Sequence, residues 1–257
     1  MSGNQYETRR YLHEYLLLHY GQPKELGPFS SIPRDWLRFH NRLRQEFLLP
    51  IPSRATAQGL DLGCAVGRFT FELGRVLNRV TGIDSSRSFI RAARQMAKRH
   101  SLRVAIQETG SQVSSIRLIL PQALWRSRVQ FRVGDAMALA AFPDQAFQVV
   151  TAINLIDRLP QPRAFLSQLP RLLSPGGQLL IASPFTWLRE YTPPQEWLSS
   201  KRLQELFRPS FRLARHGDLP FFIREHRRKF QLVVAEVFTF VRHPLRSSAG
   251  IKSSWKA

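Results

Sequence analysis

The stretch LDLGCAVG, Leu60 to Gly67, decides the fold of this 257-residue chain. An apolar segment carries Asp61 near its end, and two glycines follow, Gly63 and Gly67. Residues 68–77 then have the composition of a helix. Glycine at a turn lets the backbone approach a ligand without a clash at Cβ. This order of strand, tight turn and helix start is typical of the places where α/β folds bind nucleotide-like ligands.

The glycine spacing argues against two common phosphate-binding motifs. There is no G-x-G-x-x-G, and no Walker lysine follows the second glycine. The pattern D-x-G-x-x-x-G resembles motif I of the class I S-adenosylmethionine-dependent methyltransferases. That cofactor has a cationic sulfonium and an amino-acid tail, which suit an acid beside a glycine turn. The resemblance therefore implies S-adenosylmethionine as the cofactor.

The composition indicates a basic globular protein. The net charge is +20, from 38 basic and 18 acidic residues. This charge would attract nucleic acid or another anionic surface, but the arginines are spread along the chain and no aromatic-basic RNA-binding signature is visible. A general solubility trait and a polyanionic partner both stay open, and nucleic acid is not the favoured partner.

The lone cysteine, Cys64, allows no internal disulfide and fits a reducing cytoplasm. It lies inside the glycine motif, where packing is a better explanation than thiol chemistry. No run of 18 apolar residues exists, so no membrane span is expected. The N-terminal residues are polar and contain no apolar signal core. We therefore expect a cytoplasmic protein.

Apolar periodicity divides the chain into three parts. Residues 1–50 predict a helical extension that acts as a lid, and residues 51–243 predict the methyltransferase domain, with a hairpin insertion at 102–120. Residues 244–257 predict a basic flexible tail. Strands are expected at 59–62, 80–83, 129–133, 147–153, 178–182, 211–214 and 232–241. Alternation of strands and helices predicts an α/β fold with a parallel sheet. The resemblance implies the Rossmann-like class I fold, with a seven-stranded, mostly parallel sheet and an antiparallel last strand.

Three acids stand at the carboxyl ends of successive predicted strands: Asp61, Asp84 and Asp135. The carboxyl ends of parallel strands meet at one crevice, so these carboxylates should lie together. Each alone could be a helix N-cap, but their matched positions favour a shared ligand. The resemblance assigns Asp61, with both glycines, to the methionine end of the cofactor. It assigns Asp84 to the ribose hydroxyls and Asp135 to the adenine amino group. The predicted cofactor site is completed by Cys64, Ser85, Ala136 and Asn154.

The segment NLIDRL begins at Asn154, after the fourth predicted strand. No Pro-Pro-Tyr follows Asn154, which disfavours a generic DNA or glutamine amide methylase. Asn154 and Asp157 are three residues apart and share one side of a helical turn. A carboxamide beside a carboxylate can hold a ring that has one N–H donor and one N acceptor, such as imidazole. We predict both as catalytic residues. The alternative is that Asp157 pairs with Arg158 at the surface.

A closer resemblance covers the chain from about Tyr6 to about Val241. It is carried by YETRRYLHEYLLLHYG, DLGCAVGRFTFEL, GIDSSRSFIRAA, VGDAMAL, NLIDRL, SPFTWLREYTPPQEWL and DLPFFIREHRRKFQ. These segments resemble the methyltransferase domain of ovothiol biosynthesis, which methylates an imidazole nitrogen of 5-thiohistidine (4-mercaptohistidine). In many ovothiol enzymes an iron-dependent sulfoxide synthase precedes this domain. Because the present sequence shows no such domain, we expect a separate sulfoxide synthase to supply the substrate.

The resemblance also suggests which residues bind the acceptor. The amino-acid head of thiohistidine needs charged partners, for which Tyr6, Arg224, Glu225 and His226 are candidates. The aromatic side chains of Trp187, Tyr191 and Phe230 could form the walls of the ring pocket. The histidines show no metal-ligand spacing, so no metal is expected. Rival hypotheses are a protein-histidine or RNA methyltransferase, and a catalytically inactive nucleic-acid-binding protein of the same fold.

Overall fold

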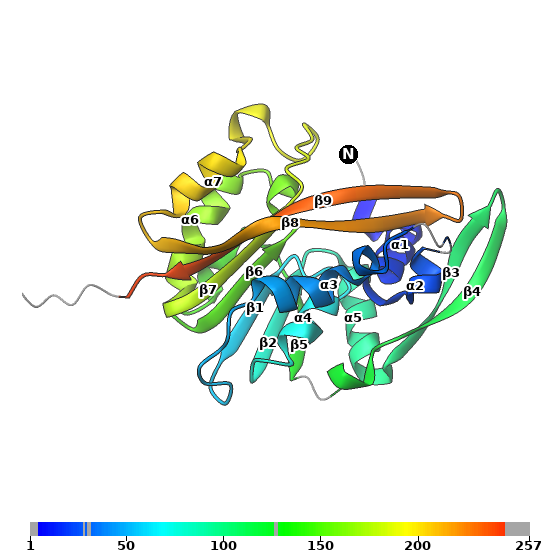
Figure 1. The fold of residues 1–257 in the computed structure, drawn as a ribbon, viewed down its shortest axis with the longest axis horizontal. Coiled ribbons are helices and arrows are strands. Elements are labelled where there is room, and N and C mark those ends of the chain that lie inside the picture. Colours follow the sequence, from blue (N-terminus) through cyan, green and yellow to red (C-terminus); the bar gives the residue numbers. More distant parts are fainter. Residues whose placement is uncertain (1–4, 28, 30–31, 126–127, 245–257) are drawn as a thin grey trace, which may run out of the picture.

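The computed structural model describes residues 5–27, 29, 32–125 and 128–244. One mixed sheet of seven strands dominates this part of the chain (Figure 1). Residues 245–257 of the predicted basic tail lie outside the described residues. The strands, in spatial order, are β5 (Val129–Val133), β2 (Arg79–Asp84), β1 (Gln58–Leu62), β6 (Phe147–Ile153), β7 (Leu173–Ser183), β9 (Lys229–Arg242) and β8 (Phe211–His226).

Strand direction follows the prediction. The five strands from β5 to β7 pair in parallel, and β9 is antiparallel to β7 and to β8. The predicted Rossmann-like fold, with seven strands and one reversed last strand, is confirmed. Because the carboxyl ends of β1, β2, β5 and β6 meet at one edge, the residues that follow these strands come close together.

Side-chain alternation along the buried strands produces two cores. On β7, Leu179 and Ile181 pack toward the α6 side of the sheet, and Leu180 and Ala182 pack toward the α4 side. Each face of the sheet is therefore covered by helices (Figure 1). The helices of the methyltransferase domain are α4 (Arg68–Leu73), α5 (Arg87–Arg99), α6 (Pro162–Leu172) and α7 (Ser200–Phe207).

The N-terminal extension is helical, as expected, and it packs into the domain. It consists of η1 (Gln5–Glu7), α1 (Arg9–Tyr20), α2 (Pro23–Leu26), η2 (Arg34–Arg38), α3 (Phe39–Arg42) and the π-helical η3 (Leu43–Phe47). The sequence predicts a loop where α2 forms, and one continuous helix where η2, α3 and η3 form. Leu16, Leu17 and Tyr20 of α1 are fully buried in the core beside α5. The extension is therefore part of the hydrophobic core.

Two hairpins project from the domain. The insertion forms β3 (Ser101–Thr109) and β4 (Gln112–Ile119), an antiparallel pair separate from the main sheet. Strand β8 has 16 residues where 211–214 was predicted, and β9 has 14 where 232–241 was predicted; both extend beyond the sheet across α1 toward β3 (Figure 1). The missed part of β8, residues 215–226, mixes charged residues, Gly217 and Pro220 with apolar ones, so it shows no regular strand pattern. Short 3-10 turns complete the described elements: η4 (Gln122–Leu124), η5 (Leu139–Ala141), η6 (Ile156–Arg158) and η7 (Pro194–Glu196).

No helix in the described part of the chain has both the length and the apolar character that crossing a bilayer requires.

Candidate active site

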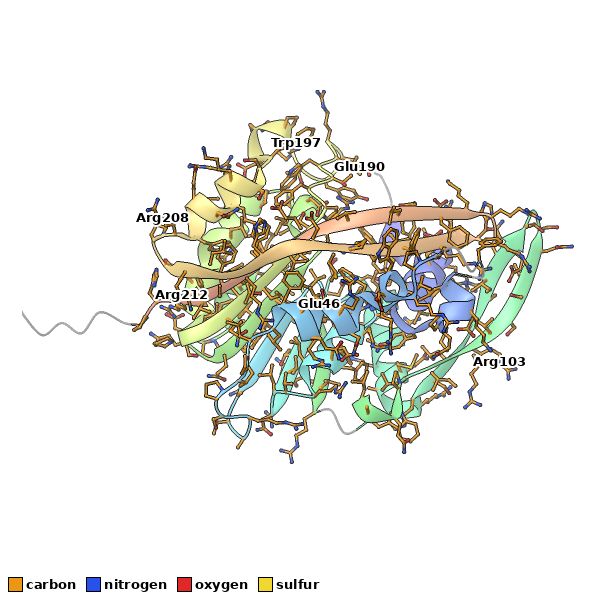
Figure 2. The ribbon with its side chains drawn as sticks, in the orientation of Figure 1. Glu46, Arg103, Glu190, Trp197, Arg208 and Arg212 are labelled. Atoms are coloured by element: carbon orange, nitrogen blue, oxygen red, sulfur yellow. The ribbon has the colours of Figure 1, made fainter. Side chains whose placement is uncertain are left out.

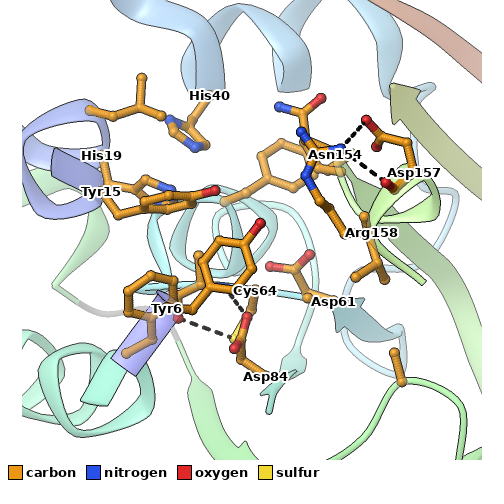
Figure 3. Close-up of a pocket in the computed structure, with 18 of the residues that line it drawn as sticks. Tyr6, Tyr15, His19, His40, Asp61, Cys64, Asp84, Asn154, Asp157 and Arg158 are labelled. Carbon is orange, nitrogen blue, oxygen red and sulfur yellow. Dashed lines mark hydrogen bonds and ion pairs between the residues drawn. The ribbon is translucent and has the colours of Figure 1, made fainter. Parts of the chain in front are cut away.

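A cavity of about 280 Å³ lies at the carboxyl ends of the parallel strands (Figure 3). The loops after β1, β2, β5 and β6 form its floor, and residues from α1, α3 and the β8–β9 hairpin form its other walls. Ten of the residues predicted from the sequence line it: Tyr6, Asp61, Gly63, Cys64, Asp84, Ser85, Asp135, Ala136, Asn154 and Asp157.

Asp61 is a deeply buried carboxylate of the floor. Its Oδ2 accepts a hydrogen bond from Thr70 Oγ1 at 2.6 Å, and its Oδ1 accepts one from Thr151 Oγ1 at 2.7 Å. Burial raises the pKa of Asp61 to about 6, against the lowering effect of the two hydroxyl donors. The two threonines fix the carboxylate, and each oxygen keeps a lone pair for a ligand.

Asp84 holds the turn after β1 in place. Its Oδ2 accepts from the backbone N–H of Ala65 at 2.9 Å, and its Oδ1 accepts from that of Ser86 at 2.9 Å. Burial raises the pKa of this carboxyl. Ala65 has a φ of +48°, an unusual conformation for a residue with a side chain. The carboxylate therefore helps to maintain a strained turn at the cavity.

The two motif glycines have different surroundings. Gly63 (φ +68°) lines the cavity, and a Cβ there would come within 2.8 Å of Leu155. Gly67 (φ +93°) lies outside the lining, and a Cβ there would come within 2.7 Å of the Phe131 ring. Gly67 is required for the close approach of the turn to β5. Cys64 also lines the cavity. Its thiol is buried, and burial raises the pKa of the thiol.

The loop after β5 contributes the third acid. Asp135 is exposed at the rim, and its Oδ1 accepts from the backbone N–H of Met137 at 2.8 Å. Ala136 is buried beside it, and Ser85, which follows the neighbouring strand β2, also lines the cavity. The three predicted acids therefore lie around one space, as the sequence indicated.

Asn154 has the feature of the cavity that most needs a ligand. Its φ is +52°, and its backbone N–H donates to Ala182 O at 2.7 Å, which fixes the residue at the end of β6. Its side-chain Oδ1 is buried and has no hydrogen-bond partner among the described residues. An unpartnered buried amide oxygen is costly, and strained backbone collects at functional sites. A bound molecule with an N–H or O–H group would satisfy it.

Asp157 is buried, only 1% exposed, and is paired with its neighbour. Its Oδ2 accepts from Arg158 Nη1 at 2.8 Å, and its Oδ1 accepts from Ser183 Oγ at 3.3 Å (Figure 3). The same guanidinium donates to Thr186 O at 2.8 Å. Burial raises the pKa of Asp157. The pair with Arg158 thus exists, but it lies inside the cavity and not at the surface.

The N-terminal extension supplies a wall of the cavity, in which the sequence analysis named only Tyr6 as a site residue. The rings of His19 and His40 are in tilted contact, with 4.2 Å between their centroids and an interplanar angle of 49°, and both line the cavity with Tyr15. The backbone N–H of Arg68 donates to His19 Nδ1 at 3.3 Å. Burial lowers the pKa of His19 to about 3 and lowers that of His40 as well. Both rings are neutral near pH 7. The sequence does not reveal that the two rings meet, because His19 lies on α1 and His40 lies on α3.

The β8–β9 hairpin supplies a further wall, made mostly of apolar side chains. These residues were not predicted, since they lie on strands whose length the sequence understates. They are Phe221, Ile223, Gln231 and Val233.

Three predicted substrate residues on this hairpin lie outside the cavity lining. Arg224 is buried and donates to Glu108 Oε2 at 2.9 Å and to the Glu25 carbonyl, which ties β8 to β3 and α2. Glu225 forms ion pairs with Arg10 at 2.7 Å and Lys229 at 2.9 Å. His226 Nδ1 accepts from the backbone N–H of Arg228 in the hairpin turn. All three serve contacts between elements.

The three predicted aromatic walls also lie outside the lining. Phe230 packs edge-on against Phe29 at 6.1 Å. Trp187 joins the core beside α7, and its Nε1 donates to Leu198 O at 3.0 Å. Tyr191 comes nearest, since its ring lies 5.4 Å from the guanidinium of Arg158 and 6.4 Å from the ring of Tyr6. It can act on the cavity through these two side chains.

No cluster of three or more metal-ligating side chains occurs within residues 5–244 as far as they are described.

Comparison with known proteins agrees with this geometry. Residues 60–181 match the family model described as a methyltransferase domain. The ubiquinone biosynthesis O-methyltransferase of Xanthomonas oryzae pv. oryzae (strain PXO99A) is 26% identical over 168 residues, 62% of this chain and 60% of that protein. The enzyme of the same name from Nitrosococcus oceani is 26% identical over 170 residues, covering 63% and 61%. The match thus spans less than two thirds of these relatives.

Solved structures show the same fold. The N-methyltransferase NodS from Bradyrhizobium japonicum WM9, in complex with S-adenosyl-L-homocysteine, superposes with a TM-score of 0.54 at 17% identity, covering 90% of this chain and 98% of that one. The cyclase SpnF superposes with a TM-score of 0.59 at 16% identity, covering 94% and 95%. A fold shared by such different proteins identifies no acceptor.

The family match over residues 60–181 and the cavity at the strand ends are those of a Rossmann-like methyltransferase domain. S-adenosylmethionine is its cofactor, and the residues of the cavity fit it. Carboxylates stand at the carboxyl ends of β1 and β2, and a glycine turn allows close approach at Gly63.

Proposed function

We propose that the protein transfers a methyl group from S-adenosylmethionine to an imidazole nitrogen of 5-thiohistidine. The unpartnered oxygen of Asn154, beside the buried Asp157, is the observation that carries this proposal. An amide oxygen needs a donor, and a neutral imidazole offers one N–H and one lone pair. The resemblance of the NLIDRL segment and of the N-terminal extension to the ovothiol family supports this acceptor.

The proposed roles divide the cavity into two parts. Asp61, Gly63 and Cys64 face the methionine end of the cofactor, and Asp84 and Ser85 face its ribose. Asp135 and Ala136 face the adenine. When bound, S-adenosylmethionine would supply a methyl carbon on a cationic sulfur: a nitrogen lone pair forms a bond to that carbon, and the sulfur leaves as the neutral thioether of S-adenosylhomocysteine.

The acceptor occupies the second part, under the N-terminal extension. Asn154 accepts the ring N–H, which fixes the tautomer and leaves the other nitrogen free to react. Asp157 balances the positive charge that develops on the ring, and it holds Arg158 toward the carboxylate of the amino-acid head. Tyr15 and the neutral pair His19 and His40 exclude water from the ring.

A second candidate is O-methylation of a phenolic hydroxyl. Two observations favour it: the names of the curated relatives, and a neutral His40 beside apolar Phe39 and Phe221. A neutral imidazole can accept the phenolic proton. A separate sulfoxide synthase as supplier of thiohistidine belongs to the first candidate only.

The test is methyl transfer from labelled cofactor to a panel of acceptors: 5-thiohistidine, histidine, a histidine-containing peptide, RNA and a catechol. The proposal expects the highest kcat/KM for 5-thiohistidine. It also expects Asn154→Ala to lower that value at least tenfold while S-adenosylhomocysteine still binds. Preference for the catechol, with Asn154→Ala unaffected, would establish the second candidate and refute the first.

A further inference from the structure

One segment of the chain is much more basic than the rest. Residues 85–134 contain ten arginines and lysines but one carboxylate, Glu108. That carboxylate is already paired with Arg224 at 2.9 Å. The segment covers a fifth of the chain and carries nearly half of its net charge of +20. It forms α5, the β3–β4 hairpin and the edge strand β5, so these charges share one edge of the fold.

Helix α5 arranges its cations in a row. Arg87, Arg91, Arg94 and Lys98 are spaced four, three and four residues apart, which places them on one face over about 16 Å. All are exposed, and within the described residues none has an ion-pair partner. They border a hollow of about 370 Å³ that has no acidic residue in its lining. The lining consists of Arg87, Ile90, Arg91, Arg94, Gln95, Lys98, Arg99 and Val133.

An exposed aromatic stack lies at the carboxyl end of the same helix. His100 caps α5 in the left-handed conformation, and Trp125 stacks on it at 4.5 Å with an interplanar angle of 7°. Trp125 is 45% exposed, and its Nε1 donates to Leu120 O at 2.8 Å, which fixes the indole. Arg99 directly precedes His100, Arg128 lies three residues after Trp125, and both arginines are exposed. A rigid, open indole face among cations is the arrangement on which a nucleobase stacks.

We propose that the α5 face and the Trp125–His100 stack form a binding site for single-stranded RNA. The row of cations contacts successive backbone phosphates, and an unpaired base stacks on Trp125. The site lies on the outer side of α5, away from the acceptor part of the cavity. It therefore does not depend on which acceptor the enzyme methylates.

RNA fits this surface better than a lipid bilayer does. A membrane-binding helix needs a wide apolar face beside its cations, whereas the exposed face of α5 is polar and its apolar residues, such as Ile90 and Met96, are buried. The hollow also suits the separate phosphates of an RNA chain better than it suits the flat, charged surface of a bilayer.

The test is fluorescence anisotropy with a labelled 12-nucleotide RNA of mixed sequence and the full chain. Two variants address the site: the triple change Arg91→Gln, Lys98→Gln and Arg99→Gln, and the single change Trp125→Ala. The matched control is Lys201→Gln, Arg208→Gln and Arg212→Gln on α7 and β8, where Arg208 and Arg212 lie at the opposite end of the molecule from Arg103 of the hairpin (Figure 2). Circular dichroism and S-adenosylhomocysteine binding verify that each variant is folded.

The proposal expects salt-dependent binding that the α5 triple variant weakens about tenfold or more and Trp125→Ala weakens about fivefold or more, with the control triple within twofold of the unmodified protein. Equal loss in both triple variants would mean diffuse attraction to a basic protein and would overturn the site. So would absence of binding at 100 mM salt, or Trp125→Ala that binds as well as the original. Preferential binding to vesicles rich in phosphatidylserine would instead indicate a membrane partner.

Discussion

At the scale of single residues, the cavity is organised by carboxylates that burial has modified. Asp61, Asp84 and Asp157 all have raised pKa values because their side chains are removed from water. Each is held by hydrogen bonds from the protein. Such groups are costly without a ligand, and a cationic ligand offsets that cost. Two consequences can be measured.

Cofactor affinity should depend on the ionisation of Asp61. With a pKa of about 6, its carboxyl is protonated in acid and charged above pH 6. Only the charged form attracts the ammonium of the cofactor tail, so affinity is full above pH 6 and falls about tenfold per pH unit below it. Calorimetric titration of S-adenosylhomocysteine between pH 5 and 8 measures this. Asp61→Asn should bind weakly with a flat profile in that range. An unmodified protein whose affinity is constant from pH 5 to 8 would exclude Asp61 from cofactor binding.

Turnover should depend on the charge of Asp157. Asp157→Asn keeps the size of the side chain but cannot balance Arg158 and a cationic ring. We expect kcat to fall by roughly 10² or more, with S-adenosylhomocysteine affinity within about threefold of the original. The control is Asp144→Asn, which alters an exposed pair with Arg171. If Asp157→Asn turns over at the original rate, Asp157 serves only the fold.

The residue scale also shows what sequence reasoning can reach. Acids and glycines placed directly after strands were predicted, because strand direction brings such positions together. Of the substrate residues predicted on the closing segments, Arg224 and Glu225 instead join elements to one another. A charged side chain beside an apolar strand looks alike in both roles, since only the tertiary partner, here Glu108 or Arg10, distinguishes them.

At the scale of elements, the N-terminal extension and the β8–β9 hairpin close the cavity together. Residues from α1, α3, β8 and β9 line the space opposite the cofactor loops. Tyr20 of α1 donates to Val66 O at 2.7 Å, so the extension also contacts the glycine motif. Removal of the whole extension would expose Leu16, Leu17 and Tyr20 and destabilise the fold, so its role as a lid needs a smaller change.

Glu7 provides that change, because it fastens η1 to α5 without lining the cavity. Its Oε1 accepts from the backbone N–H of Arg87 at 2.7 Å, and its Oε2 accepts from that of Ser88 at 3.3 Å. Glu7→Ala should loosen the neighbouring Tyr6 and weaken S-adenosylhomocysteine binding several-fold, at a cost of about 1 kcal/mol in unfolding free energy. Calorimetry and urea denaturation measure the two effects. Glu205→Ala, which removes an exposed pair on α7, is the control. Affinity unchanged in Glu7→Ala would argue against the lid.

The element scale also sets the limit of the sequence-based prediction. Strands Val129–Val133 and Phe147–Ile153 and helix Arg87–Arg99 form at the predicted residues, because local periodicity and the Ser86 cap define them. Most of β9 was predicted, but the outer part of β8, residues 215–226, was missed, because β8 there contacts α1 and β3 and is not buried in the main sheet. Tertiary contacts of this kind leave no local pattern.

At the scale of the whole molecule, buried histidines should make the fold sensitive to acid. His40 has a lowered pKa, so the folded state binds fewer protons than the unfolded state below pH 6.5. Stability from this neutral ring is therefore present above pH 6.5 and is lost as the pH falls, by roughly 1 kcal/mol per pH unit. Asp61 acts in the opposite direction, because its raised pKa stabilises the protonated fold and that contribution is lost as the pH rises from 3.8 to about 6.

A comparison of two proteins separates these effects. The contribution of Asp61 is common to the original protein and to His40→Phe, so it cancels in the difference. We expect the variant to gain about 1–2 kcal/mol relative to the original as the pH falls from 7 to 5. Urea denaturation at each pH measures this. Parallel profiles would mean that His40 titrates normally.

The fold thus places the cofactor part of the cavity at the carboxyl ends of the parallel strands and the acceptor part beneath the N-terminal helices. The central claim is that the acceptor atom is an imidazole nitrogen. The most direct measurement is two-dimensional NMR of the product formed from 5-thiohistidine and S-adenosylmethionine carrying a ¹³C-labelled methyl group. The account predicts that the labelled methyl couples to ring carbons through a nitrogen. A methyl on sulfur, or no transfer to this acceptor by folded protein that binds the cofactor, would contradict it.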